Sequence, residues 1–170
     1  MEIWDLYDEN RNIIGEHVRG TELPENGFHL VIHVWIKNSA GQYLMTRRSP
    51  NKRTFPLKWE CVGGSTLKGE DSLSSAVREV REEVGLDLCP AAGTRLFTKI
   101  RKTIGGKRYN DIVDVWLFRH DGEVSLENAT TDEVAQIRWM NRQEIAALRE
   151  SGDLVTSIKD LDYFFNEMEP

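Results

Sequence analysis

Three glutamates, Glu79, Glu82 and Glu83, have the side-chain type and the spacing that metal or acid–base chemistry requires. They share one face of a helix predicted over residues 71–84, about 130° around the axis from its apolar stripe. Like charges at this spacing destabilise a helix by about a few tenths of a kcal/mol per pair. The pattern therefore indicates either a solvated acidic face or a group of carboxylates that holds a cation. Carboxylate oxygens suit Mg²⁺ or Mn²⁺, whose coordination is completed by water and substrate phosphate.

The segment around these glutamates favours the cation. The turn Val62-Gly63-Gly64 precedes the helix, and glycines allow backbone atoms to approach a metal or a phosphate closely. Arg78 lies beside the acidic face and can pair with it. The helix is predicted to begin at Asp71 and to end before Gly85, a usual C-cap residue. Its core-facing stripe consists of Leu73, Val77, Val80 and Val84.

The remaining predicted elements form a mixed α/β pattern within a single domain, residues 1–170, because no repeat or linker interrupts the chain. A helix capped by Asn141 and Glu144 ends at Gly152, and a last helix spans Thr156–Met168. Residues 49–69 are predicted to be mostly loop. A hairpin is predicted at Ile3–Ile14, and strands at Phe28–Ile36, Gln42–Thr46, Leu96–Lys102, Tyr109–Arg119 and Val134–Met140.

Composition limits the class of protein. Of the 170 residues, 39% are hydrophobic and 29% charged, which suffices for a core and is too apolar for disorder. The net charge of −6 has the wrong sign for a broad face that binds a nucleic-acid polymer. No apolar run is long enough to span a membrane, and the first residues lack the pattern of a signal peptide. Cys61 and Cys89 lack the spacing of a zinc site or a disulfide framework, so we expect a cytoplasmic protein.

Two local basic clusters could still hold a small anion. Arg suits bidentate recognition of phosphate, whereas Lys acts as a point charge. The alternative for the first cluster is a solubilising loop, and for the second, on a predicted hairpin tip, we expect a solvated rim. The first comprises Arg47, Arg48, Lys52, Arg53 and Lys58, and the second Lys99, Arg101, Lys102, Lys107 and Arg108.

The segment Gly64–Leu86 resembles the Nudix box. Gly64 is followed after five residues by Glu70 and, after seven more, by the run Arg78-Glu-Val-Arg-Glu-Glu-Val-Gly-Leu86. The resemblance implies the Nudix fold, an α/β/α sandwich with a mixed β-sheet. It also implies Mg²⁺- or Mn²⁺-dependent hydrolysis of a diphosphate bond in a nucleoside diphosphate-linked or similar small molecule.

Roles for individual residues follow from this resemblance. Glu79, Glu82 and Glu83 correspond to the carboxylates that bind the metal and supply the base, and the carbonyl group of Gly63 corresponds to a further ligand. Arg78 corresponds to the residue that orients the glutamates by ion pairing. Which glutamate acts as the base stays open, because several lie so close together.

Two further acidic positions have a counterpart in the family. Glu70 is expected either to support the metal ligands or to bind an additional metal. Many members recruit another acid from a loop before the last strand, and Glu133, with Asp132 behind it, occupies a similar place. The alternative for Glu133 is a surface acid at the start of a strand.

A looser resemblance, over about residues 1–65, points to isopentenyl-diphosphate isomerase, a Nudix-fold enzyme. In that enzyme a cysteine stands five residues after the tryptophan, where this chain has Gly64, and Cys61 does not take its place. Because the hydrolase box is intact, the chain is interpreted as an isomerase-like branch of the Nudix hydrolases. The residues that carry the resemblance are His29-Leu-Val31, Leu44–Arg48, Lys52, Phe55-Pro56 and Trp59.

The second resemblance implies a binding region and leaves alternatives open. Arg48 and Lys52 fall where the isomerase binds diphosphate, with Arg47 adjacent, whereas His29 is expected to be a hydrogen-bonded strand residue. The alternatives to hydrolysis are isomerisation of isopentenyl diphosphate and a non-catalytic nucleotide-binding module. Nucleoside triphosphates, nucleotide sugars, dinucleotides and prenyl diphosphates all remain as substrates. The family also implies a homodimer as an option, with the N-terminal hairpin as an available interface.

Overall fold

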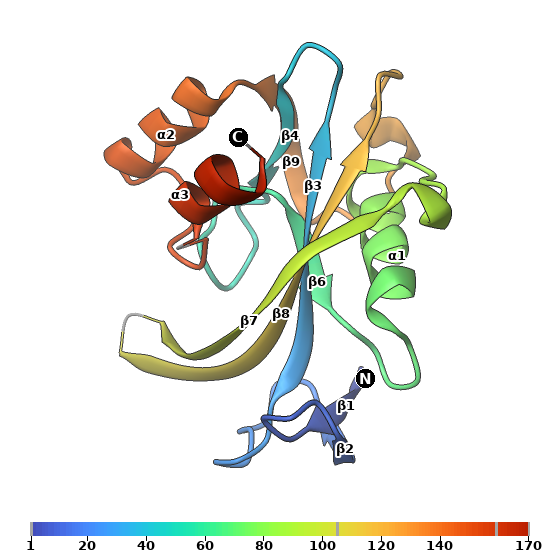
Figure 1. The fold of residues 1–170 in the computed structure, drawn as a ribbon, viewed down its shortest axis with the longest axis vertical. Helices are drawn as coiled ribbons and strands as arrows, with labels where there is room; N and C mark the ends of the chain where they lie inside the picture. Colours follow the sequence, from blue (N-terminus) through green and yellow to red (C-terminus); the bar gives the residue numbers. More distant parts are fainter. Residues whose placement is uncertain (1, 105, 159, 170) are drawn as a thin grey trace.

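Helices cover both faces of a twisted mixed β-sheet in the computed structural model, which describes residues 2–104, 106–158 and 160–169 (Figure 1). The sheet follows the order β5–β4–β3–β8–β7, with β6 also paired to β3 and β9 to β4. Strands β3 and β8 run parallel, and the other pairs in the sheet are antiparallel. This is the predicted α/β/α sandwich. The sheet strands are β3 (His29–Lys37), β4 (Tyr43–Arg48), β5 (Trp59–Glu60), β6 (Val62–Ser65), β7 (Thr94–Ile104), β8 (Lys107–Arg119) and β9 (Val134–Met140).

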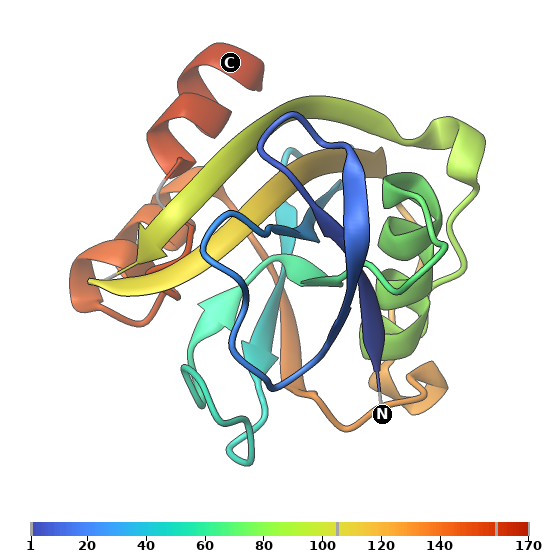
Figure 2. The same ribbon diagram turned by 90° about the horizontal axis from the view of Figure 1, so that it is seen from below.

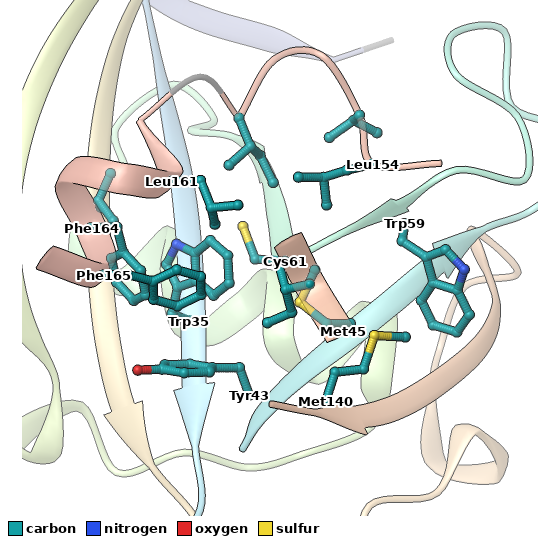
Figure 3. Close-up of a cluster of buried hydrophobic side chains, with 14 of the residues drawn as sticks. Trp35, Tyr43, Met45, Trp59, Cys61, Met140, Leu154, Leu161, Phe164 and Phe165 are labelled. Atoms are coloured by element: carbon teal, nitrogen blue, oxygen red, sulfur yellow. The ribbon is translucent and has the colours of Figure 1, made fainter. Parts of the chain in front are cut away.

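Strand β3 is buried on both faces because its alternate side chains serve two cores. Ile32, Val34 and Ile36 pack against helix α1 (Ser72–Val84), and each is 0% exposed. Trp35 points to the opposite face, into a second core (Figure 3). That core lies beneath helix α2 (Arg142–Ser151) and the C-terminal helical segment.

The C-terminal segment corrects one prediction. Instead of a helix over Thr156–Met168, the described residues form a turn, then α3 (Leu161–Tyr163), then a π-helical turn η3 (Phe164–Met168); Lys159 lies outside the described residues. Tertiary contacts explain the difference, because Arg101 donates to the carbonyl group of Ser157 and Lys99 pairs with Asp160. The wider turn places Phe164 and Phe165 together against Trp35 and Tyr43.

The predicted N-terminal hairpin forms from β1 (Ile3–Tyr7) and β2 (Ile13–Val18) and lies across one end of the sheet (Figures 1 and 2). Its connecting loop carries Arg11, whose guanidinium group donates two hydrogen bonds of 2.8 and 2.5 Å to Asp114 on β8. Asp114 is 0% exposed. An ion pair between a partly exposed arginine and a buried aspartate therefore fastens the hairpin to the central sheet.

Local signals placed most of the other elements correctly. The capping box of Asn141 and Glu144 is present at the start of α2, and Gly152 closes that helix. The prediction of loop over residues 49–69 was wrong in part, because the short strands β5 and β6 lie within it. Trp59 on β5, Val62 on β6 and Cys61 between the two strands are all buried. Short 3₁₀ helices lie at η1 (Pro90–Ala92) and η2 (Leu126–Asn128). In the described ranges, no helix has the length and apolarity needed to cross a membrane.

Candidate active site

Helix α1 carries the three glutamates of the box, of which Glu79 and Glu82 are partly exposed and Glu83 is buried with the core-facing residues. Asp71 caps the helix by accepting a 2.7 Å hydrogen bond from the backbone N–H of Ser74, and Gly85 ends it in the left-handed conformation, with φ of 69°. Ala76, Val80 and Val84 are 0% exposed beneath β3 and β6. Of the predicted apolar stripe, Val80 and Val84 are buried but Leu73 and Val77 only partly so, and Glu83 is buried instead; the core-facing side of the helix is therefore rotated toward Glu83 relative to the prediction.

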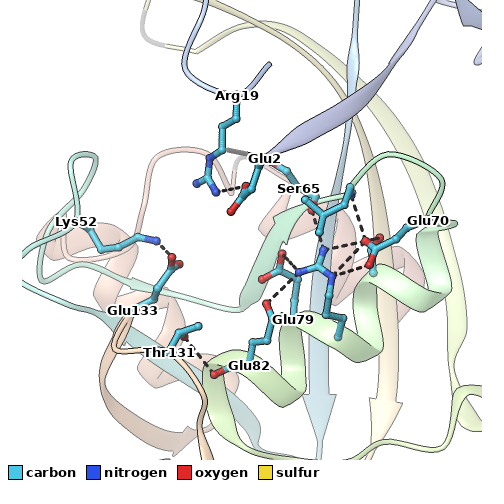
Figure 4. Close-up of polar contacts among 12 residues, drawn as sticks. Glu2, Arg19, Lys52, Ser65, Glu70, Glu79, Glu82, Thr131 and Glu133 are labelled. Atoms are coloured by element: carbon cyan, nitrogen blue, oxygen red, sulfur yellow. Dashed lines mark hydrogen bonds and ion pairs between the residues drawn. The ribbon is translucent and has the colours of Figure 1, made fainter. Parts of the chain in front are cut away.

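Arg78 joins the acidic side chains into one network (Figure 4). Its Nη1 donates to Glu79 and Glu82 at 2.9 and 3.0 Å, and its Nε and Nη2 donate to Glu70. Nη2 also donates to the carbonyl group of Ser65, 3.0 Å away. Arg78 thus fixes the two glutamates to the strand that precedes the helix.

Glu70 serves this network from outside the cavity. Its carboxylate accepts hydrogen bonds from Arg78, from the hydroxyl of Ser75 and from the backbone N–H of Leu67. These hydrogen bonds outweigh burial, which alone would raise the pKa of Glu70, and lower it below the usual value. The carboxylate is therefore ionised and already occupied.

The glycine turn before the helix makes room for the site. A Cβ atom on Gly64 would lie 2.2 Å from Oε1 of Glu79, so no side chain fits at this position while Glu79 keeps its place. A Cβ atom on Gly63 would lie 2.8 Å from the carbonyl oxygen of Ile32 in the paired strand. Both glycines line the cavity described below.

Glu83 differs from its neighbours because it is buried, 5% exposed, and accepts no hydrogen bond from any described residue. Burial raises its pKa well above the usual value, and the carboxylates of Glu60, Glu79 and Glu133 raise it further. Burial also raises the pKa of Glu79, although Arg78 opposes that shift. Ionised carboxylates crowded in this way need a positive charge near them.

A cavity of about 360 Å³ extends from α1 toward the N-terminal hairpin and toward strands β7 and β8. Arg47 lies outside its lining and donates to the carbonyl group of Leu57 instead. Glu70 lies outside it too. The predicted site residues that line the cavity are Arg48, Lys52, Gly63, Arg78, Glu79, Glu82, Glu83 and Glu133.

The two cations of the first basic cluster that reach the cavity are paired. Arg48 forms an ion pair with Glu60, and Lys52 forms one with Glu133. Glu133 is brought there because its loop is tied to α1: the hydroxyl of Thr131 donates to the carbonyl group of Glu82 at 3.2 Å. The cavity wall therefore alternates positive and negative groups.

Several lining residues were missed by the sequence analysis. Glu60 follows the buried Trp59 in a stretch predicted as loop, and Glu2 and Arg19 reach the cavity from the hairpin, where they pair with each other at 2.5 Å. Arg101 and Asp111 also line it. The signal for Asp111 was a carboxylate within a predicted strand, which it shares with Asp114.

The donor set fits a divalent metal ion. The carboxylates of Glu79, Glu82 and Glu83 offer oxygen ligands, which Mg²⁺ and Mn²⁺ prefer. Among the described residues, no hydrogen-bond donor compensates the charge of Glu83. In the described part of the chain, no three His, Cys, Asp or Glu side chains are close enough together to bind one metal ion in their present positions. Arg78 occupies the space between Glu79 and Glu82.

Comparison with known proteins assigns the family. The model of the NUDIX domain matches residues 27–160. An uncharacterized Nudix hydrolase from Listeria monocytogenes is 38% identical over 97% of this chain and 91% of its own length. The chain therefore belongs to the Nudix hydrolases, a family of enzymes that hydrolyse pyrophosphate bonds.

Two further similarities bear on the branch and the fold. An isopentenyl-diphosphate Delta-isomerase from Mycolicibacterium vanbaalenii is 30% identical over 86% of this chain and 81% of its own length. The crystal structure of a Deinococcus radiodurans protein superposes with a TM-score of 0.77 over 99% of this chain and 100% of that one, at 22% identity. The first agrees with the isomerase-like character of the sequence, and the second supports the fold.

Proposed function

We propose that this chain is a Mg²⁺- or Mn²⁺-dependent diphosphohydrolase that acts on a nucleoside diphosphate-linked or similar small molecule. The observation that carries the proposal is the buried Glu83, which lies without a described hydrogen-bond donor beside Glu79 and Glu82 in a cavity lined by Arg48 and Lys52. Such a cavity contains both cations for phosphate oxygens and carboxylates for a metal.

In this proposal Glu79, Glu82 and Glu83 hold the metal ion, and the carbonyl group of Gly63 adds a ligand. A divalent ion, when bound, neutralises the diphosphate and lowers the pKa of a coordinated water molecule. Arg78 orients Glu79 and Glu82 through the hydrogen bonds that it already makes. Either Glu82 or a neighbouring carboxylate then accepts the proton of the attacking water.

The other predicted residues take supporting roles. Arg48 and Lys52 bind the diphosphate by exchanging their present carboxylate partners for phosphate oxygens, which frees Glu133 as a further acceptor for a proton. We assign Glu70 to the positioning of Arg78 rather than to a metal. Its carboxylate oxygens already accept hydrogen bonds from Nε and Nη2 of Arg78, from the hydroxyl of Ser75 and from the backbone N–H of Leu67. Arg47 supports the loop and is left outside the proposed site.

Two observations favour hydrolysis over isomerisation. The position of the isomerase's cysteine is Gly64, where the Glu79 carboxylate leaves no space for a side chain. Cys61 lies in the cavity lining, but burial raises the pKa of its thiol well above the usual value, so it stays protonated at neutral pH. The proposed reaction therefore depends on the carboxylates and not on a thiol.

The test measures Mg²⁺-dependent turnover on nucleoside triphosphates, nucleotide sugars, dinucleotides and prenyl diphosphates, with phosphate release and product mass as readouts. Glu83→Gln is expected to lower kcat/KM at least about a hundredfold, about 2.7 kcal/mol of barrier. The control is Glu127→Gln, the same change at an exposed site outside the cavity, which should keep full activity. Rearrangement of isopentenyl diphosphate with unchanged mass would instead identify an isomerase.

Stability gives an independent readout of the same site. Without metal, Glu83→Gln should unfold at an equal or higher temperature than the wild type, because it removes a buried charge that has no described donor. With saturating Mg²⁺ the order should reverse, since binding at a hundred times Kd stabilises the wild type by about 2.7 kcal/mol. A Glu83→Gln protein that gains as much from Mg²⁺ as the wild type would rule out this metal site. Nucleotide binding without any turnover would favour a non-catalytic module.

The same proposal includes a cytoplasmic location and the option of a homodimer. Cys61 and Cys89 are both free thiols, and Cys89 is exposed, which suits a reducing compartment. Ile13 and Ile14 on β2 are 62% and 53% exposed, which supports the hairpin as an interface between two copies. Cell fractionation and light scattering test the two points separately.

A further inference from the structure

A buried polar cluster lies in the active-site cavity, outside the set of residues assigned to hydrolysis. His29 on β3, Asp111 on β8 and Arg101 on β7 occupy matching positions on three adjacent strands, so they form a row across the sheet. Arg101 forms an ion pair with Asp111 through Nη2 and donates from Nη1 to the carbonyl group of Ser157, 3.1 Å away. The three side chains are 11%, 1% and 11% exposed.

Within the part of the chain that the structure describes, each residue of this cluster keeps a polar atom without a hydrogen-bond partner. Nδ1 of His29 lies 3.3 Å from Oδ1 of Asp111, within ion-pair distance for a protonated histidine, but the two atoms do not form a hydrogen bond with each other. Nε of Arg101 also lacks a partner among the described residues. Buried polar atoms in proteins normally have a hydrogen-bond partner. Because these three atoms lie beside a cavity, we infer that a ligand in the cavity supplies their partners.

The cluster also marks the place where the active-site cavity meets a second cavity. His29 lines both, and the second, of about 800 Å³, is further lined by Trp4 and Arg108. Trp4 stacks on the His29 ring with a centroid distance of 4.4 Å, which fixes the orientation of that ring. A molecule with its diphosphate at α1 would therefore extend past the cluster into a larger space.

We propose that the His29–Asp111–Arg101 cluster recognises neighbouring hydroxyl groups on a sugar attached to the diphosphate, such as the ribose of a nucleoside. Oδ1 of Asp111 accepts a hydrogen bond from one hydroxyl, and Nε of Arg101 donates to the oxygen of another. A prenyl chain offers neither group and would leave all three polar atoms unsatisfied, so the cluster selects against it. This inference rests on the proposed function, because it places the diphosphate beside α1.

The experiment compares Asp111→Asn with Asp114→Asn as a matched control. Both aspartates lie on β8, both are buried and both pair with an arginine, but Asp114 lines neither cavity. The probes are a nucleoside α,β-methylene diphosphate and methylenediphosphonate, each with Mg²⁺, measured by calorimetry. Asp111→Asn should weaken binding of the nucleoside compound at least about tenfold and that of methylenediphosphonate less than about twofold. Asp114→Asn should change neither.

Arg101→Lys provides a second variant if Asp111→Asn does not fold, because it keeps a positive charge beside Asp111 and removes Nε. Equal weakening of both probes, or the same loss in Asp114→Asn, would overturn the assignment. So would a prenyl methylenediphosphonate that binds the wild type as tightly as the nucleoside compound. Because binding is measured without turnover, selective weakening in an inactive protein would reject the proposed hydrolysis and leave the sugar site standing.

Discussion

Gly63 and Gly64 illustrate how two adjacent residues of the same type have different physical reasons to be glycine. The space beside Gly64 is filled by the carboxylate of Glu79, a functional group. The space beside Gly63 is filled by the backbone carbonyl group of Ile32, part of the β3–β6 pairing. The absence of a side chain at Gly64 therefore leaves room for a carboxylate of the proposed site, and its absence at Gly63 leaves room for the sheet pairing.

Alanine at each position should separate these two roles. Gly64→Ala is expected to displace Glu79 and to lower kcat/KM by about a hundredfold, with little loss of stability. Gly63→Ala should instead destabilise the fold by about 1–3 kcal/mol, because backbone cannot move aside as a side chain does. Activity assays and urea unfolding of both variants measure the difference.

Gly15 provides the control for this comparison. A Cβ atom there would have no neighbour within 4 Å, so Gly15→Ala should change neither quantity. If Gly64→Ala kept full activity, the close packing of Glu79 against the turn would have no catalytic importance.

At the scale of elements, α1 depends on its first turn because the rest of the helix carries three like charges on one side. Asp71→Ala removes the side-chain acceptor for the backbone N–H of Ser74 and should cost about 1 kcal/mol. In a protein of this size that lowers Tm by about 2–4 °C. Asp71→Ser should retain most of the stability, since a hydroxyl also caps a helix. Equal losses in the two variants would show that the charge of Asp71, rather than the cap, stabilises α1.

The elements that the sequence predicted well are those whose signals are local. The caps and periodicity of α1, the capping box of α2 and the turn of the N-terminal hairpin all lie within a few residues of the structure that they specify. The helix predicted over Thr156–Met168 failed because Lys99 and Arg101, from a distant strand, hold residues 157 and 160 in another conformation.

The same distinction applies to the site. The sequence placed the three glutamates close together on one helix but did not predict the burial of Glu83, whereas Arg48, Lys52 and Glu133 do reach the cavity. Glu60 and Asp111 could not be placed, because their positions follow from the pairing of β4 with β5 and of β3 with β8. Pairing between distant strands leaves no pattern in a single sequence.

At the scale of the whole molecule, the pair between Arg11 and Asp114 connects the hairpin to the sheet. Burial alone would raise the pKa of Asp114, but hydrogen bonds from Arg11, Ser72 and Thr98 lower it below the usual value. A lowered carboxyl pKa contributes stability above the pKa of the unfolded chain, and this contribution is lost as the pH falls through the folded-state pKa.

Arg11→Met should therefore lower the free energy of unfolding by about 1–2 kcal/mol at pH 7, a modest value because Arg11 is 32% exposed. The difference from the wild type should shrink as the pH falls below the ordinary aspartate pKa of about 3.9 and through the lower folded-state pKa of Asp114. Urea unfolding at pH 7 and pH 3 measures both effects. A difference that does not change with pH would mean that Arg11 stabilises the hairpin by packing and not by its charge.

The parallel pairing of β3 with β8 has a consequence for the order in which the molecule is made. All of α1 and β7 lies between these two strands in the chain, so a ribosome releases the box glutamates before it releases Asp111. Pairing across such a long connection is a slow step in folding. Until β8 arrives, β3 has an open edge beside Ile32 and Val34, which makes the nascent chain prone to aggregate. The cavity wall formed by β8 is thus completed after α1 during synthesis, and the lining residues Glu133, Ser157 and Ile158 follow later still.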